Sequence, residues 1–178
     1  MSFLSRLLRP KGDDRAAYRP LWHRTVELAR DPRWYAEGGI ADTVGGRFDT
    51  ITLALCAVLL RMEREPDLVE PSVRVTELFV EDMDGQLRES GVGDLMVGKH
   101  IGKLVSTLGG RLGALREALA AGDNTALVDA VGRNVTLAEH GNPVRIAALL
   151  RGFADALAVL PAAEILAAHI ELPESKLA

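Results

Sequence analysis

The run from Ile51 to Leu60, ITLALCAVLL, contains no charged residue. A helix that is apolar on all sides is buried on all sides, and this run is only about half the length that a bilayer-spanning helix needs. We therefore expect a central buried helix over about residues 48–63, with the rest of the chain packed around it. Cys56 lies in this run and is expected to be an inert core residue, because free cysteines are among the most buried residue types.

A second long helix is predicted over about residues 94–121, where apolar side chains recur at helical spacing. The matching positions are Ile101, Leu104, Val105, Leu108, Leu112, Leu115 and Leu119. A parallel stripe of small residues, Gly102, Ser106, Gly109 and Gly113, permits another helix to approach closely, although in a soluble protein such a stripe can also be a simple packing accommodation. Alternating strand patterns do not exceed about four residues. The fold class is therefore predicted to be all-α, a compact helical bundle of about six to seven helices.

The remaining helices and the domain limits follow from proline, glycine and capping signals. Helices are expected over about residues 20–28, 42–64, 72–90, 125–139 and 144–160, with Asp42 capping the second and a short helix beginning at Pro161. A chain of 178 residues fits one domain. We expect a flexible basic tail over 1–12, an all-α domain over 13–170 and a short C-terminal tail over 171–178.

The charge of the chain is small in total but segregated along the sequence. The net charge of −4 argues against a nucleic-acid binder, so no DNA partner is expected, and the single cysteine suits the reducing cytoplasm. Residues 1–30 carry seven basic residues against three acidic ones, whereas residues 63–94 carry ten acidic residues against three basic ones. Opposed patches of this kind can orient a partner, although a solvated surface would give the same pattern.

The first eleven residues, MSFLSRLLRPK, are predicted to contact a membrane surface. Apolar and basic side chains alternate there at helical spacing: Phe3, Leu4, Arg6, Leu7, Leu8, Arg9 and Lys11. The segment lacks the apolar core and the cleavage site of a signal peptide. Basic groups are attracted to anionic lipids, so we expect peripheral contact with the inner face of the cell membrane.

The motifs that usually carry chemistry are incomplete in this chain. Gly93 to Lys99 nearly matches a phosphate-binding loop, but His100 replaces the hydroxyl residue and no strand precedes it. The spacings Glu-x-x-His, HExxH and CxxCH are absent. The carboxylates of Glu81, Asp82 and Asp84 are expected to form a solvated or partner-binding face. We therefore expect no catalytic centre, no metal and no cofactor.

The run from Phe79 to Lys99, FVEDMDGQLRESGVGDLMVGK, resembles the ubiquinol–cytochrome c chaperone family. The family pattern is close to D-M-D-x-x-L-R-E-x-G-V-G-D-L-x-V-G-K/R. Two further blocks are similar to those of the family. Upstream lies Tyr35 with Asp42-Thr43 and Gly46-Arg47-Phe48-Asp49, and downstream lie Arg111-Leu112 and Arg133-Asn134-Val135. Where the family commonly has an aromatic pair, this chain has Leu108 and Gly109.

The resemblance implies a non-catalytic helical assembly factor for the respiratory ubiquinol–cytochrome c reductase. Such a protein would bind cytochrome b, its precursor or another reductase subunit at the membrane face, beside the ribosome or a second assembly factor. The predicted partner-binding residues are Leu78, as an apolar contact among acids, with Asp82, Asp84, Arg88, Asp94 and Lys99. The alternative is a small enzyme or ligand-binding bundle with a pocket near Asp82, Asp94 and Lys99. A deep polar cavity would favour that alternative.

Overall fold

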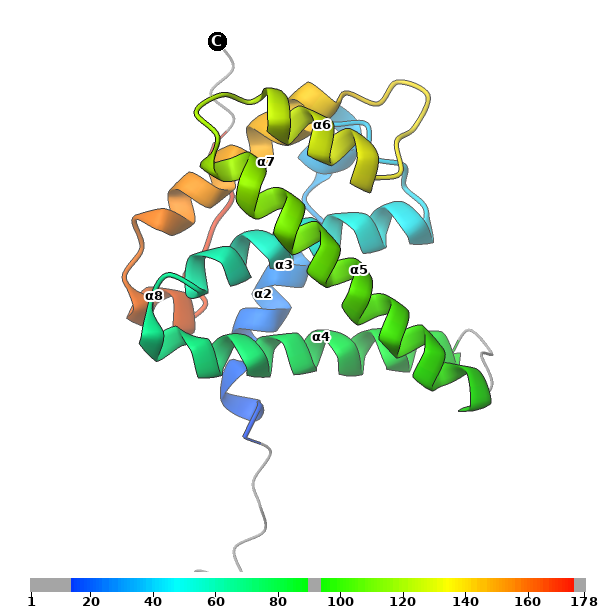
Figure 1. The fold of residues 1–178 in the computed structure, drawn as a ribbon, viewed down its shortest axis with the longest axis vertical. Coiled ribbons are helices and arrows are strands. Elements are labelled where there is room, and N and C mark those ends of the chain that lie inside the picture. The colour runs from blue at the N-terminus through cyan, green and yellow to red at the C-terminus, as the bar shows by residue number, and fades with distance from the viewer. Residues whose placement is uncertain (1–13, 90–93, 175–178) are drawn as a thin grey trace, which may run out of the picture.

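The structure is a computed structural model that describes residues 14–89 and 94–174, without the side chains of residues 87, 88 and 94–100. Within these ranges it contains seven α-helices, three short helical segments and no strand (Figure 1). In chain order they are η1 (Ala16–Tyr18), α2 (Arg19–Ala29), the π-helical η2 (Arg33–Glu37), α3 (Val44–Met62), η3 (Pro66–Leu68), α4 (Val69–Glu89), α5 (Asp94–Ala120), α6 (Thr125–Asn134), α7 (Pro143–Ala158) and α8 (Ala162–Leu166). The predicted all-α class is confirmed.

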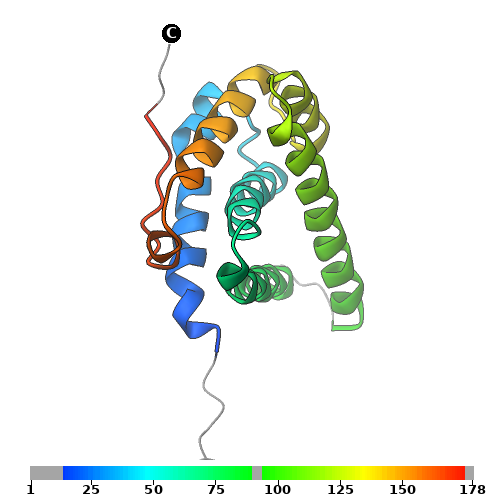
Figure 2. The same ribbon diagram turned by 60° about the vertical axis from the view of Figure 1, so that its left-hand side comes forward.

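Helix α3 forms the centre of the molecule, as its apolar run predicts. Every residue from Asp49 to Leu59 is buried. Helices α2, α7, α5 and α4 all pack against α3. Figure 2 shows α3 enclosed between α2 and α7 on one side and α5 on the other, with α4 beneath. Burial on all sides explains why the stretch from Leu53 to Leu59 carries no hydrogen-bonding or charged side chain apart from the Cys56 thiol.

The N-terminus of α3 is capped by Thr43, so the prediction of Asp42 as the cap is wrong. The Thr43 side-chain oxygen accepts a hydrogen bond from the Gly46 amide at 3.2 Å, and its backbone has the extended conformation of an N-cap. The Asp42 carboxylate accepts a hydrogen bond from the Arg47 guanidinium at 2.7 Å instead. Beside this cap the chain turns so closely that a Cβ at Gly46 would lie 1.9 Å from the Ala41 carbonyl oxygen.

Helix α6 ends at Asn134, five residues before the predicted limit. From Val135 the backbone is extended and pairs with residues 39–41. The Ala41 amide donates to the Thr136 carbonyl, and the Ala138 amide donates to the Gly39 carbonyl, both at 2.9 Å. These bonds replace the ones that would have continued the helix, which explains the error. At α4 the helix begins three residues earlier than predicted, because a proline such as Pro71 is tolerated in a first turn.

The small-residue stripe of α5 does not receive another helix within the described part of the chain. A Cβ added at Gly102, Gly109 or Gly113 would meet no atom within 4 Å. The interpretation of this stripe as a close helix contact is therefore wrong. The opposite side of α5 holds its buried residues, Leu108, Arg111, Leu115 and Ala118.

Replacing Gly46 with alanine should destabilise the protein by about 2 kcal/mol or more, because the added methyl group overlaps a backbone carbonyl that cannot move freely. Gly109→Ala is the matched control, and should stabilise by about 0.5–1 kcal/mol, because alanine is the better helix former and the site is open. Urea unfolding of both variants measures the two effects. Equal effects of the two substitutions would contradict the close approach at Gly46.

Candidate functional site

A buried ion pair between Asp49 of α3 and Arg111 of α5 positions the helices around the candidate site. One guanidinium nitrogen, Nη2, lies 2.5 Å from Asp49 Oδ1, and the two residues are only 5% and 9% exposed. The other carboxylate oxygen accepts a hydrogen bond from the Thr136 amide at 2.7 Å. Arg111 also donates to the Thr52 hydroxyl and lies over the Phe48 ring, 5.5 Å from its centroid. The pair therefore joins α3, α5 and the segment after α6.

An open groove of about 630 Å³ lies between α4, α5 and the C-terminal end of α3. Its floor is apolar and draws on all three helices. The floor residues are Leu59 from α3, Val73 and Val80 from α4, and Ile101 and Leu112 from α5. Val73 is 50% exposed, so part of this apolar surface faces solvent. An uncovered apolar surface in a folded chain marks a place where another molecule can bind.

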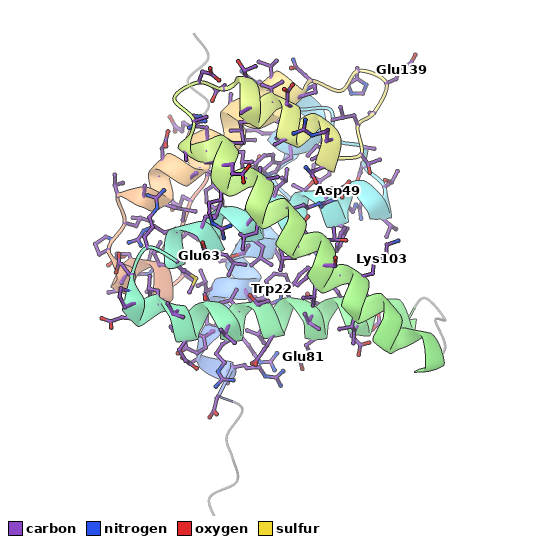
Figure 3. All side chains as sticks on the ribbon, in the orientation of Figure 1. Trp22, Asp49, Glu63, Glu81, Lys103 and Glu139 are labelled. Carbon is purple, nitrogen blue, oxygen red and sulfur yellow. The ribbon has the colours of Figure 1, made fainter. Side chains whose placement is uncertain are left out.

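Carboxylates line the rim of the groove: Glu63, Glu77, Glu81 and Asp84. Figure 3 shows Glu63 near the end of α3 and Glu81 on the side of α4 that faces away from it. Glu63 pairs with Arg116 at 2.9 Å, and Glu77 pairs with Arg74 at 3.2 Å. The Glu63–Arg116 pair is exposed and the Glu77–Arg74 pair is half-buried. Ion pairs near the surface contribute little stability.

Glu81 joins the basic N-terminal region to the acidic helix α4. Its Oε2 atom lies 3.2 Å from Arg15 and 3.7 Å from Arg19. Arg15 also lines the groove. The segregated charges of the sequence are thus partly partners of one another within the molecule, rather than two patches that face separate ligands.

The structure separates the predicted site residues of α4. Asp84 is half-buried and lines the groove, so its expected position on the outer face is wrong. Asp82 is half-buried and lines a separate hollow of about 350 Å³ between α2 and α4, together with Trp22 and His23. The side chains of Arg88, Asp94 and Lys99 and the tail over 1–12 lie outside the described residues. Of the predicted residues whose side chains are described, Asp84 and Asp82 therefore line different hollows.

Leu78 is 2% exposed, so its predicted role as a surface contact among acids is wrong. Val75, Phe79 and Met83 are also buried, and Leu78 extends their face towards α2. Helix α4 packs against α2 as well as α3 and α5. Its buried face is therefore wider than a single stripe of every fourth residue.

Sequence reasoning missed the groove because Ile101 and Leu112 look like ordinary core positions. A signal exists on α4, where Val73, Glu77, Val80 and Asp84 recur at spacings of four, three and four residues. This second stripe mixes apolar and acidic side chains, and all four residues line the groove. A helix face that mixes apolar and acidic residues, next to a fully apolar face, indicates that the apolar core is not completely covered there.

Cys56 is buried, as predicted, and burial raises the pKa of its thiol to about 12. A thiol is nucleophilic only as the thiolate, so this residue stays unreactive at neutral pH. Among residues 14–89 and 94–174, no group of three or more histidine, cysteine, aspartate or glutamate side chains is arranged to hold a metal ion. Over the same part of the chain, no helix is both long and apolar enough to cross a membrane.

The family model described as "Ubiquinol-cytochrome C chaperone" matches residues 36–171, which include most of the groove and the whole Phe79–Lys99 run. The chain belongs to the ubiquinol–cytochrome c chaperone family. This membership confirms the resemblance seen in the sequence. The fold is also similar to the crystal structure of the Cbp3 homolog from Brucella abortus, with a TM-score of 0.79, 30% identity and coverage of 97% of both chains. A search of curated proteins found no match.

Removing either partner of the Asp49–Arg111 pair should cost about 3–5 kcal/mol, because the other charge would remain buried without compensation. Arg111→Met and Asp49→Asn test each side separately. The double variant should lose less than the sum of the two single losses, since it leaves no lone charge in the core. Denaturant unfolding gives all three values. A loss below about 1 kcal/mol in both single variants would contradict the structural role of the pair.

Proposed function

We propose that the protein is a non-catalytic assembly factor of the ubiquinol–cytochrome c reductase that holds cytochrome b or its precursor at the cytoplasmic face of the membrane. Family membership supports the process in which it acts. The groove between α4, α5 and the end of α3 is the observation that carries the proposed client surface.

The chemistry of the groove suits a segment of an uninserted membrane protein. Such segments are apolar helices, and lysine and arginine are enriched where they meet the cytoplasm. An apolar helix can lie on a floor such as that of Val73, Val80 and Ile101, which excludes water from its surface. Its basic flank would then meet the carboxylates on the rim, Glu77 and Asp84 among them.

The proposed client surface revises the residues predicted from the sequence. Asp84 stays in it as a rim residue of the groove, and Leu78 leaves it because it is buried. Asp82, Arg88, Asp94 and Lys99 remain proposed contacts near the same two helices. At the position of the family's aromatic pair, Leu108 is buried and Gly109 has open space around it, and neither residue lines the groove.

Filling the groove should reduce client binding. Val73→Arg places a long cationic side chain over the apolar floor. Val144→Arg is the matched control, because it makes the same substitution at another exposed valine, on α7 outside the groove. In a strain lacking the native gene, the wild-type chain and Val144→Arg should restore the assembled reductase. Val73→Arg should restore less than about one-fifth of it, which corresponds to roughly 1 kcal/mol of lost affinity.

The assembled reductase is measured by native electrophoresis and by the haem b absorption spectrum, and cytochrome b captured on the tagged chain is quantified beside it. Transcript levels of the reductase subunits should not change. Normal reductase in the strain without the gene would overturn the assembly role. Reduced capture by both variants would overturn the groove as the client surface. In the first case a small enzyme with a site near Asp82 becomes the hypothesis to pursue.

We also propose that residues 1–11 provide the membrane contact. Three basic groups would add about 1 kcal/mol each near an anionic surface, and four apolar side chains would add insertion energy. The full chain should float with phosphatidylglycerol vesicles at low salt and dissociate at high salt, because salt screens the attraction. A chain lacking residues 1–11 should not float. Flotation that survives this deletion would place the membrane contact elsewhere.

A further inference from the structure

The first described residues run along the acidic side of α4 and lead to the groove. Arg19 and Arg15, four residues apart, both contact Glu81. Between them, the Tyr18 hydroxyl donates a hydrogen bond to Glu70 at 3.1 Å. Arg15 is itself part of the groove lining. The preceding segment of the chain therefore starts at the edge of the apolar floor.

The preceding segment is basic over residues 1–12, and Asp13 and Asp14 separate this basic stretch from Arg15. It carries Arg6, Arg9 and Lys11 and no acid. Phe3, Leu4, Leu7 and Leu8 supply an apolar face at helical spacing. The segment thus has the same chemistry as the proposed client, namely apolar side chains flanked by positive charge. The groove offers the complement, with carboxylates around an apolar floor.

The length of the segment is sufficient to reach the floor. From Arg15 back to Phe3 the chain spans about 18 Å as a helix and about 40 Å when extended. Because Arg15 already lines the groove, either conformation places the leucines within reach of Val73 and Val80. A tethered segment also has a high effective concentration, so weak contacts suffice to occupy the site.

We propose that residues 1–13 of this chain occupy the groove between α4 and α5 when no client is bound, with Phe3, Leu4, Leu7 and Leu8 on the apolar floor. The inference rests on the proposed function in treating the groove as the client surface, and it makes the N-terminal segment an internal competitor for that surface. The same apolar face cannot contact lipid and the groove at once. Binding of the N-terminal segment to the membrane would therefore leave the groove empty at the membrane surface, where the client is made.

Disulfide trapping in the full chain tests this placement. Ser5→Cys is combined with Val73→Cys inside the groove, or with Val144→Cys on α7 as the control. The two valines are 50% and 62% exposed, so accessibility does not favour the groove position. Cys56 stays in place, because its buried protonated thiol takes no part in exchange. With oxidised glutathione in dilute solution, the groove pair should form its intramolecular bond at least about tenfold faster than the control pair.

A second variant separates docking from mere proximity. Replacing Leu4, Leu7 and Leu8 with serine removes the apolar contacts and keeps the tether length, so the rate of the groove pair should fall at least about fivefold. Equal rates for the groove and control pairs, or a groove rate unaffected by the serine substitutions, would overturn the proposal. Client capture is measured separately on the chain with Val73→Arg. If Val73→Arg loses client capture but the groove pair forms no disulfide, the N-terminal placement is overturned and the client surface stands. If the groove pair forms its disulfide but Val73→Arg captures client normally, the client surface is overturned and the N-terminal placement stands.

Discussion

The Asp49–Arg111 ion pair is the interaction on which the arrangement of the helices depends. It joins residues far apart in the sequence and also binds the Thr136 amide, so one carboxylate holds three segments together. Moving two charges out of water is costly, and the hydrogen bonds to Thr52 and the Thr136 amide offset part of that cost, while Arg111 Nε is buried without a hydrogen-bond partner among the described residues. Thr52 and the Phe48 ring supply further contacts for the guanidinium. The direction in which α5 leaves the core follows from this anchor.

The groove is a consequence of that direction. Helix α5 is held to α3 at Arg111 and diverges from α4 on the side of Leu59, so the apolar residues of α4 and α5 do not close on each other. The same divergence places acidic residues of α4 around an uncovered floor. An uncovered apolar surface favours aggregation, and the charged side chains around this one keep its edge hydrated.

Helical periodicity predicted the class and most helices, because apolar spacing reports burial directly. It failed where tertiary hydrogen bonds compete with local ones. Thr43 rather than Asp42 caps α3, since the Asp42 carboxylate pairs with Arg47. Leu78 was placed among the acids because a stripe analysis assumes one packed face, whereas α4 packs on two sides. The family could be predicted from the Phe79–Lys99 run, but the groove could not. The groove consists of faces that three helices leave uncovered. The residue pattern of one helix does not show which other helices pack against it.

The glycines of α5 lower the free energy needed to unfold this helix locally. Gly102, Gly109, Gly110 and Gly113 each lower helix stability by about 1 kcal/mol relative to alanine, and no neighbouring atom depends on their small size. Among the described side chains of α5, full burial begins only at Leu108. Amide hydrogen exchange should therefore be faster over residues 101–107 than at the buried positions from Leu108 to Ala118, where packing offsets the glycines. Because α5 packs against α4 as well as α3, this weakness favours local opening of the helix along the groove wall and not movement of the whole helix.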